Sequence, residues 1–345
     1  MHLNYFAMQL LENISIKPYT TFGIEAKARF FAEITSVDQL KKIFQEPKVA
    51  GLPFMPIGGG SNMLFTADFN GVIFRMGIKG ISVTRLDDDY SLVTGNAGEE
   101  WDAFVNWCVS HGYAGVENLS LIPGMVGSCP IQNIGAYGVE VADVIEYLTV
   151  YDKETGEIVT LQNAECKFGY RDSIFKHEAK GRYVILSVTF KLAHHPAFHT
   201  KYGAITTELD AMGITTLSID AIRKAVIAIR SRKIPDPFVI GNAGSFFKNP
   251  TVGADHYSRL KAEYPTIIAF SLPTGSFKLA AGWLIEQCGW KGYRKGDAGV
   301  HAYQALVLVN YGTATGHEII SLADEIMLSV FNTFGVHLDM EVNII

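Results

Sequence analysis

Residues 122–138 read IPGMVGSCPIQNIGAYG. Glycines and prolines interrupt an otherwise apolar segment, and Gln132 and Asn133 lie between them. An irregular backbone leaves polar groups unpaired when it is buried in apolar surroundings, and these groups need partners. A bound cofactor would supply such partners, so we interpret this loop as a ligand site in preference to a simple corner.

A second glycine-rich loop, GGGSN, occupies residues 58–62. It is not a phosphate-binding P-loop, because no Gly-Lys-Ser/Thr follows it. It does not fit a Rossmann fingerprint either, because it lacks the third glycine and leads into a predicted strand. A tight turn explains the loop as well as a ligand does. Two such loops separated by a helix could, however, hold a dinucleotide at two places.

Composition sets the class of protein. The chain has 345 residues, 48% hydrophobic and 19% charged, which permits two or three domains. A net charge of -6 argues against nucleic acid as the main partner. The four cysteines form no C-x-x-C pair, so we expect neither a zinc site nor a disulfide framework, and a reduced, cytoplasmic setting. No apolar run is long enough to span a bilayer, which predicts a soluble protein.

Hydrophobic periodicity predicts an α+β chain. The pattern predicts a helix over 101–112 and antiparallel sheet over 144–192, with a hairpin at the Lys-Glu-Thr-Gly turn. The segment 218–235 predicts an amphipathic helix that Pro235 ends. In the sheet, one face is expected to carry Leu186, Val188, Phe190 and Leu192.

The second half is expected to form a mixed αβ unit over about 215–330. Thr315 and Glu318 fit a capping box at the start of its last helix. Residues 336–345 alternate strictly between apolar and polar, which predicts a final strand with Glu341 on its polar face.

Four motifs carry a resemblance to a known family. IPGMVGSCPIQNIGAYGVE, FGYRDSIFK, GNAGSFFKNP and the closing EVNII, in this order, resemble the bacterial UDP-N-acetylenolpyruvoylglucosamine reductases. The resemblance implies an FAD domain of the vanillyl-alcohol-oxidase (PCMH) type in two lobes, followed by a C-terminal αβ substrate-binding domain. The implied boundaries are 1–75 for lobe 1, joined by the strand 335–345; 76–214 for lobe 2; and 215–334 for the substrate domain.

The resemblance also implies the cofactors, FAD and the co-substrate NADPH. Residues 58–62 contain no histidine, so we expect FAD to be bound non-covalently. The implied cofactor contacts are Gly58, Gly59, Gly60, Ser61, Asn62, Ile122, Pro123, Gly124, Gly127, Ser128, Gln132, Asn133, Gly135 and Ala136.

The implied reaction reduces the enolpyruvyl ether of UDP-N-acetylglucosamine enolpyruvate to give UDP-N-acetylmuramate, a peptidoglycan precursor. Reduced FAD gives hydride to the terminal carbon, and negative charge collects on the adjacent carbon and its carboxylate. Arg171 would hold that carboxylate with two fixed donors, although an ion pair with Asp172 is the structural alternative. Ser245 would donate the proton to the adjacent carbon, and a turn serine is the alternative.

Glu341 matches the family glutamate that helps to stabilise the enolate-like intermediate. Because a carboxylate facing developing negative charge would repel it, we expect Glu341 to be protonated or hydrogen-bonded, with a pKa raised by burial. A solvated face of the final strand is the alternative. Phe246 and Phe247 would exclude water from Ser245.

Substrate contacts follow from the same resemblance. The segment 194–205 resembles the family's substrate-clamp insertion, with Tyr202 as the clamp. A metal site at His195 and His199 is the disfavoured alternative, because no helix aligns them and no acidic residue is near. Basic residues gather around the helix that ends near Pro235. The implied substrate contacts are Tyr137, Tyr202, Arg230, Lys233, Lys248, Asn249 and Gln304.

Three other functions remain open from the residues alone: a serine hydrolase, another flavin oxidase or dehydrogenase, and a non-catalytic nucleotide-sugar binding protein. The hydrolase would need histidine and acid partners for Ser245 in a recognisable arrangement, and we see none. We expect a monomer whose partner is a small nucleotide sugar, without nucleic acid, membrane or metal.

Overall fold

The computed structural model describes residues 9–201 and 204–345, and these residues combine α-helices with six β-sheets. The α+β composition expected from the sequence is therefore confirmed. The described residues form two compact units. Unit 1 comprises the residues up to Ile14, Ala28–Gly59 and Phe69–Arg232, and unit 2 comprises Ser15–Lys27, Gly60–Asp68 and Lys233–Ile345. The three-part division expected from the resemblance stays a prediction.

Unit 1 contains two larger sheets. Its elements are β1 (Leu11–Ser15), β2 (Lys27–Ile34), α1 (Val37–Gln45), β3 (Phe54–Ile57), β5 (Phe69–Met76), β6 (Ile81–Arg85), β7 (Tyr90–Asn96), α2 (Trp101–Ser110), β8 (Gly135–Ala136), β9 (Val139–Glu140), β10 (Ile145–Asp152), β11 (Ile158–Gln162), β12 (Tyr183–Ala193), α3 (Ile205–Ala211) and α4 (Ile219–Lys233).

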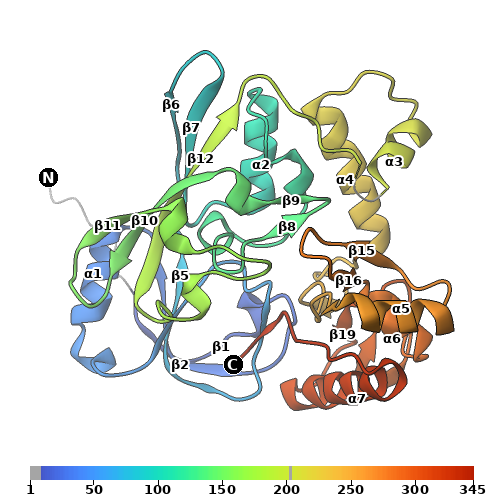
Figure 1. The fold of residues 1–345 in the computed structure, drawn as a ribbon. Helices are drawn as coiled ribbons and strands as arrows, with labels where there is room; N and C mark the ends of the chain where they lie inside the picture. Colours follow the sequence, from blue (N-terminus) through green and yellow to red (C-terminus); the bar gives the residue numbers. More distant parts are fainter. Residues whose placement is uncertain (1–8, 202–203) are drawn as a thin grey trace, which may run out of the picture. The chain divides into compact units, whose positions relative to one another are not determined.

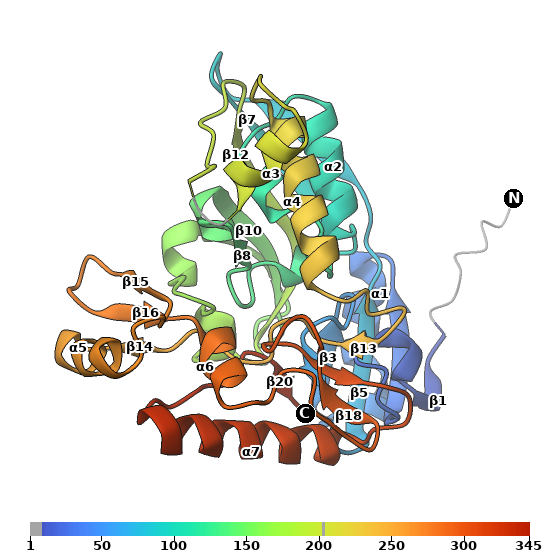
Figure 2. The ribbon, with the colours of Figure 1, turned by 90° about the vertical axis from the view of Figure 1, so that its right-hand side faces the viewer.

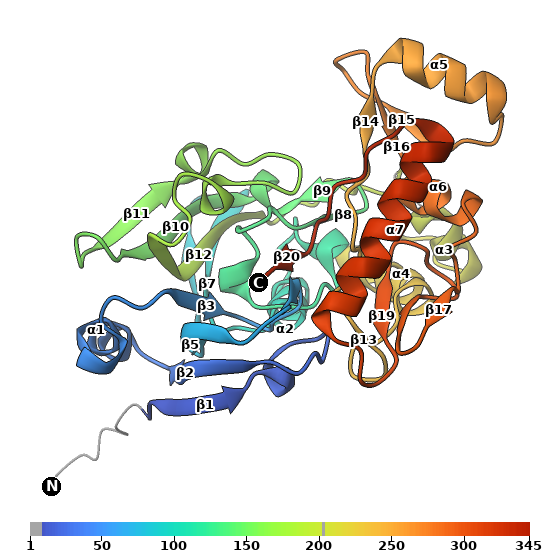
Figure 3. The same ribbon diagram turned by 90° about the horizontal axis from the view of Figure 1, so that it is seen from below.

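The first sheet has the order β1-β2-β5-β3, with β2 and β3 parallel to β5. It is visible with α1 at its edge in Figure 3. The second sheet has the order β11-β10-β12-β7-β6 and is antiparallel throughout (Figure 1). The antiparallel sheet predicted over 144–192 is confirmed, and Gly156 provides the left-handed turn of its hairpin, with a φ of 75°.

Helix α2 packs its apolar stripe on the antiparallel sheet. Trp101, Phe104 and Phe190 lie together, with ring centroids 5.0–5.9 Å apart. The indole of Trp101 donates a buried hydrogen bond of 2.8 Å to the carbonyl of Leu119. This contact fixes α2 next to the segment that leads into the loop 122–138.

The predicted helix over 218–235 is α4, which ends two residues before Pro235. Its stripe of Ile222, Val226 and Ile229 is buried against α3. Figure 2 shows the two helices side by side.

Unit 2 has one long helix and several short strands. Its elements are β4 (Met63–Leu64), β13 (Gly241–Asn242), β14 (Thr251–Val252), α5 (Ala254–Glu263), β15 (Ala269–Ser271), β16 (Phe277–Leu279), α6 (Ala281–Gln287), β17 (Arg294–Lys295), β18 (Ala298–Val300), β19 (Leu308–Asn310), α7 (Gly316–Phe334) and β20 (Asn343–Ile344). The capping box predicted at Thr315 and Glu318 is confirmed at the start of α7.

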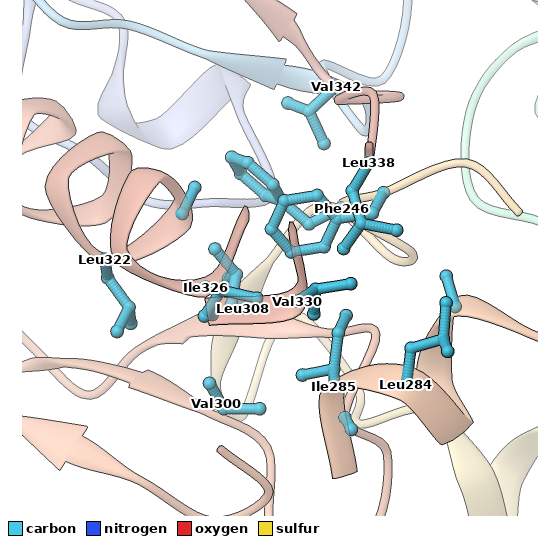
Figure 4. Close-up of a cluster of buried hydrophobic side chains, with 14 of the residues drawn as sticks. Phe246, Leu284, Ile285, Val300, Leu308, Leu322, Ile326, Val330, Leu338 and Val342 are labelled. Carbon is cyan, nitrogen blue, oxygen red and sulfur yellow. The ribbon is translucent and has the colours of Figure 1, made fainter. Parts of the chain in front are cut away.

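The core of unit 2 lies under α7. Its buried face packs with β18, β19 and the C-terminal segment, and Phe246 is fully buried among these elements (Figure 4). The predicted continuous strand over 336–345 is wrong, because regular pairing is confined to β20, which is parallel to β4. The alternation is visible in burial: Val336, Leu338 and Val342 are buried, whereas Ile344 is exposed.

In the described part of the chain, no helix is long and apolar enough to cross a membrane.

Candidate functional site

The two glycine loops meet in unit 1. A Cβ atom on Gly59 would lie 3.1 Å from the Cα of Gly124, and one on Gly58 would lie 3.0 Å from the side chain of Met125. Real Cβ atoms rarely tolerate such distances. Glycine at 58 and 59 therefore lets the two loops approach closely, because the backbone of Gly124 and the side chain of Met125 occupy the space that side chains would need.

The second loop is fixed by three backbone hydrogen bonds. Trp101 N donates to Gly124 O (3.0 Å), Val126 N to Glu99 O (2.8 Å) and Gly127 N to Ala97 O (3.0 Å). A Cβ on Gly127 would lie only 2.6 Å from the Cβ of Ala97. The two loops form a cradle of bare backbone, and such a cradle fits the diphosphate of a dinucleotide such as FAD.

The rest of the first loop belongs to unit 2. Gly60 has a φ of 59°, and a Cβ there would collide with the carbonyl of Tyr19. The amide of Asn62 donates to Glu341 O (3.2 Å), and Asn343 N donates to Asn62 O (3.1 Å). The loop is thereby tied to the segment that carries Glu341.

The side chains of two predicted cofactor contacts, Asn133 and Ser128, form hydrogen bonds within the protein. Asn133 is 1% exposed; its amide donates to Glu140 and Gly169 O, and its oxygen accepts from Ala142 N. The hydroxyl of Ser128 bonds the backbone of Met125. Their contact with a cofactor stays a prediction. Of the predicted cofactor residues, Gly60, Ser61 and Asn62 lie in unit 2, and the others lie in unit 1.

Arg171 lies in a tight turn and not on a strand. Gly169 and Asp172 exchange two backbone hydrogen bonds of 3.0 and 3.1 Å, and Arg171 between them has a φ of 55°. The guanidinium donates to Gly135 O (2.6 Å), and its Nη1 lies 2.9 Å from where a Cβ on Gly135 would be. Gly135 therefore makes room for the cation.

Asp172 has a partner of its own. Its two carboxylate oxygens lie 2.7 and 2.8 Å from Nε2 of His177. Burial alone would raise the pKa of Asp172, but the hydrogen bond and charge of His177 outweigh this and lower it. Arg171 and Asp172 do not lie on opposite faces of a strand, because the backbone turns here.

Arg230, on α4, lies next to Leu121, the residue that directly precedes the loop 122–138. Its Nε donates to Leu121 O (3.3 Å), and this is the only hydrogen bond of the guanidinium within residues 9–201 and 204–345. Burial lowers the pKa of this guanidinium. Burial also raises the pKa of Tyr137, and the charge of Arg230 opposes that rise, so the two groups lie near one another. A half-buried cation with most donors unused suits an anionic ligand.

The other cations of α4 are neutralised within the protein. Arg223 pairs with Asp102, Lys224 with Asp220 and Arg232 with Glu208. Among the described residues, no carboxylate pairs with Arg230, Lys233 or Lys248. The three cations without a carboxylate partner in this part of the chain are therefore ones that are predicted to contact the substrate.

Ser245 and Glu341 are brought together within unit 2. Phe246 N donates to Leu306 O (2.7 Å), and Glu341 N donates to Phe246 O (2.8 Å). Lys248 N donates to Asp339 O (2.8 Å), which continues this short ladder. The residue after Ser245 is thus bonded directly to Glu341 through the backbone. The catalytic roles of Ser245 and Glu341 stay predictions.

Two further predicted contacts surround this ladder. The carbonyl oxygen of the Gln304 side chain accepts from Leu306 N (3.3 Å). The side-chain oxygen of Asn249 accepts from Ala281 N (3.0 Å) at the start of α6. Lys233 is the exposed last residue of α4.

Tyr202 lies outside the described residues. His199 lies in the described part of the same segment, and its carbonyl accepts from the side-chain amide of Asn118 (2.8 Å). The same amide also donates to Tyr137 O (3.3 Å). In the described part of the chain, no group of three or more His, Cys, Asp or Glu side chains could hold a metal ion.

Backbone strain gathers in these segments. Six non-glycine residues in the described part of the chain have positive φ, and four belong to the predicted site or flank it: Leu121, Asn133, Tyr137 and Arg171. Strained backbone is concentrated at functional sites in proteins, which supports the assignment.

Sequence reasoning missed the buried groups that support the site. Asp102 accepts from both Arg223 (2.7 and 2.9 Å) and Leu121 N (2.5 Å). Arg223 lies two helical turns before Arg230, so a shared face was readable from the sequence, but its partner was not. Asn242, three residues before Ser245, was also missed.

Comparisons with known proteins show the family of the chain. Residues 28–162 match a model of an FAD binding domain, and residues 236–345 match the C-terminal domain of UDP-N-acetylenolpyruvoylglucosamine reductase. A reductase of this name from Pseudomonas putida is 49% identical over 337 residues, covering 98% of this chain and 99% of that protein. Its namesake from Burkholderia lata is 48% identical over 343 residues, covering 99% and 98%.

A solved structure supports the fold. The UDP-N-acetylenolpyruvylglucosamine reductase of Thermus caldophilus matches 98% of this chain and 99% of its own, with a TM-score of 0.66 at 22% identity. The expected FAD domain of the PCMH type with a C-terminal domain is confirmed. By its similarity to relatives along nearly its whole length, the chain belongs to the family of UDP-N-acetylenolpyruvoylglucosamine reductases.

Proposed function

We propose that the protein reduces UDP-N-acetylglucosamine enolpyruvate to UDP-N-acetylmuramate with NADPH, in the cytoplasm and as a monomer. It is a flavin-dependent oxidoreductase of its family. The observation that carries the proposal is the ladder that bonds the residue after Ser245 to Glu341, in a chain 49% identical to a reductase of this name.

FAD, when bound, supplies the hydride that the terminal carbon of the enol ether accepts. The backbone of Gly58, Gly59 and Gly124 would hold its diphosphate. The chain's own residues bind the substrate, stabilise charge and supply the proton.

Arg171 binds the substrate carboxylate. The bond to Gly135 O holds one end of the guanidinium in place. Two donors on one carboxylate also stabilise the charge that spreads onto it as the carbon–carbon double bond breaks.

Ser245 gives its hydroxyl proton to the carbon next to the carboxylate. The double bond is replaced by one C–H bond from hydride and one from this proton, so the product gains two hydrogens. A serine is a weak acid, but a carbanion is a strong base, and a fixed short approach makes the transfer feasible. Buried Phe246 and Phe247 keep bulk water away.

Glu341 stabilises the same intermediate as a protonated or hydrogen-bonded carboxyl. Replacing it with glutamine tests this role, because the amide keeps the shape but has no transferable proton. We expect Glu341→Gln to slow turnover, and a variant with full activity would remove Glu341 from the mechanism.

Arg230, Lys233 and Lys248 contact the anionic groups of the nucleotide sugar or of NADPH. They have no carboxylate partner among the described residues, unlike the neighbouring cations on α4. We expect Arg230→Met to raise KM, whereas Lys224→Met, which breaks an exposed pair, should leave KM unchanged.

The test is anaerobic absorbance in the flavin band during two additions. NADPH alone should bleach the band, and the enolpyruvyl nucleotide sugar should then restore it. Bleaching without recovery would reject the substrate, and a preparation without flavin would reject the cofactor.

A further inference from the structure

Asn242 lies three residues before Ser245 and is 2% exposed. Its side-chain oxygen accepts from Gly244 N (2.9 Å), and its amide nitrogen donates to Ile240 O (2.8 Å) and Pro235 O (3.2 Å). The first of these bonds closes a turn from Asn242 to Gly244, the residue before Ser245. The other two hold the chain that arrives from Lys233.

The backbone of Asn242 is fixed as firmly as its side chain. Its N–H donates to Thr21 O (3.1 Å), and its carbonyl accepts from the hydroxyl of Thr21 (2.7 Å). In the sheet, Asn242 is paired with Val309. The side chain therefore acts from a rigid position.

Gly244 carries the turn. Its φ is 70°, a left-handed conformation, and a Cβ there would meet nothing within 4 Å. The conformation and not the space makes glycine suitable. The bond from Gly244 N to Asn242 holds this conformation, and it is made directly before Ser245.

The chain is anchored again directly after Ser245. Phe246 N donates to Leu306 O, and Phe246 O accepts from Glu341 N. Ser245 therefore spans two fixed points, Gly244 on one side and Phe246 on the other. Only the Gly244 end is held by a side chain that substitution can remove.

We propose that Asn242 is the positioning residue for proton transfer, holding Ser245 in place through Gly244 and connecting it to the segment of Lys233. The proposal rests on the proposed function. The role of Ser245 falls after NADPH oxidation, in the step that consumes the nucleotide sugar. Loss of the hydrogen bond between Asn242 and Gly244 should therefore slow the half-reaction that consumes the nucleotide sugar. The reduction of the flavin by NADPH should keep its rate.

Asn310 offers a matched control. It is 5% exposed, lies in the same unit, and makes four side-chain hydrogen bonds: to Phe22 O, to Gly23 O, from Gly312 N and from Ala314 N. None of these bonds involves residues 243–246. Asn310→Ala should lower thermal stability at least as much as Asn242→Ala.

The experiment measures both half-reactions by rapid mixing, in protein loaded with FAD. For Asn242→Ala we expect bleaching by NADPH at the wild-type rate and recovery with the nucleotide sugar slowed by about 10- to 100-fold, because small displacements of a reacting group are this costly. Asn310→Ala should show the wild-type rate in both. Equal rates of recovery in the two variants, or an equal slowing of both half-reactions in Asn242→Ala, would overturn the proposal.

Asn242→Ser adds a rescue test. Its hydroxyl can accept from Gly244 N as the amide oxygen does, more weakly, but it cannot reach both carbonyls. Its recovery rate should lie between those of wild type and Asn242→Ala. Should the alanine variant not fold, Asn242→Ser is compared with Asn310→Ser, and equal rates would overturn the proposal. Failure of the wild type to recover would instead reject the proposed function.

Discussion

The ion pair between Asp102 and Arg223 gives a stability prediction with a magnitude. Their side chains are 22% and 10% exposed, and two hydrogen bonds of 2.7 and 2.9 Å join them. Asp102→Asn removes the negative charge and leaves the Arg223 cation buried. Asparagine can still accept the bond from Leu121 N, so the change isolates the charge.

Breaking a buried pair on one side costs ~3–5 kcal/mol. We expect the lower end, about 3 kcal/mol, because Asp102 keeps some contact with water. At ~2–4 °C per kcal/mol for a domain of this size, the melting temperature should fall by about 6–12 °C. Calorimetry and denaturant unfolding of the purified variant measure both quantities.

The pH dependence follows from the sign of the pKa shift. Burial alone would raise the pKa of Asp102, but the hydrogen bonds from Arg223 and Leu121 N outweigh it and lower the pKa. The stabilising effect is therefore fully present above the unfolded value of about 3.9 and is lost as pH falls through the folded value. The difference between wild type and Asp102→Asn should close below about pH 4.

A second substitution checks the cause. Asp102→Asn with Arg223→Met removes the stranded cation and should be more stable than Asp102→Asn alone. The comparison pair Asp152 and Arg182 has a cation that is 39% exposed, so Asp152→Asn should cost less. A double variant that is less stable than the single one would refute the reasoning, as would a loss below about 1 kcal/mol.

Three further predictions concern the cradle and buried ionisable groups. Gly127→Val should displace the second glycine loop, because a Cβ there lies 2.6 Å from that of Ala97, and the variant should therefore lose its yellow flavin on gel filtration; flavin retained at wild-type stoichiometry would contradict the cradle. Burial raises the pKa of three thiols, that of Cys166 to about 12, so native protein at pH 8 should react quickly with a thiol reagent only at the partly exposed Cys288; rapid reaction of more than one thiol would be inconsistent with this. Burial also raises the pKa of Glu117, so the wild type loses stability as pH rises above the unfolded value of about 4.3 and through the folded value; Glu117→Gln keeps an acceptor for Gly115 N and does not ionise, so its stability relative to wild type should rise between about pH 4 and pH 8, and a fall would contradict the assignment.

Local signals in the sequence predicted much of this fold. The capping box at Thr315, the helix from Trp101 and the glycine loops depend on neighbours a few residues apart, and all were readable. The continuous final strand was wrong because a strand needs a partner along its length. Residues 246–248 pair with it only briefly, and β4 pairs only with Asn343 and Ile344.

The candidate site was harder to predict where its support is distant in sequence. The turn at Arg171 depends on bonds between Gly169 and Asp172 that no periodicity shows. Which cations of α4 are available for a ligand depends on carboxylates elsewhere: Asp102 lies 121 residues before Arg223. Sequence alone shows the charges, but only packing shows which of them are already paired.

The central claim is that the protein adds hydride and a proton to the enol ether of the nucleotide sugar. Mass spectrometry of the sugar after incubation with protein, FAD and NADPH tests it most directly. The account predicts a product heavier than the substrate by two hydrogens, formed in equal amount to the NADPH consumed, and its near absence with Ser245→Ala. Unchanged sugar with wild-type protein that holds FAD would contradict the account.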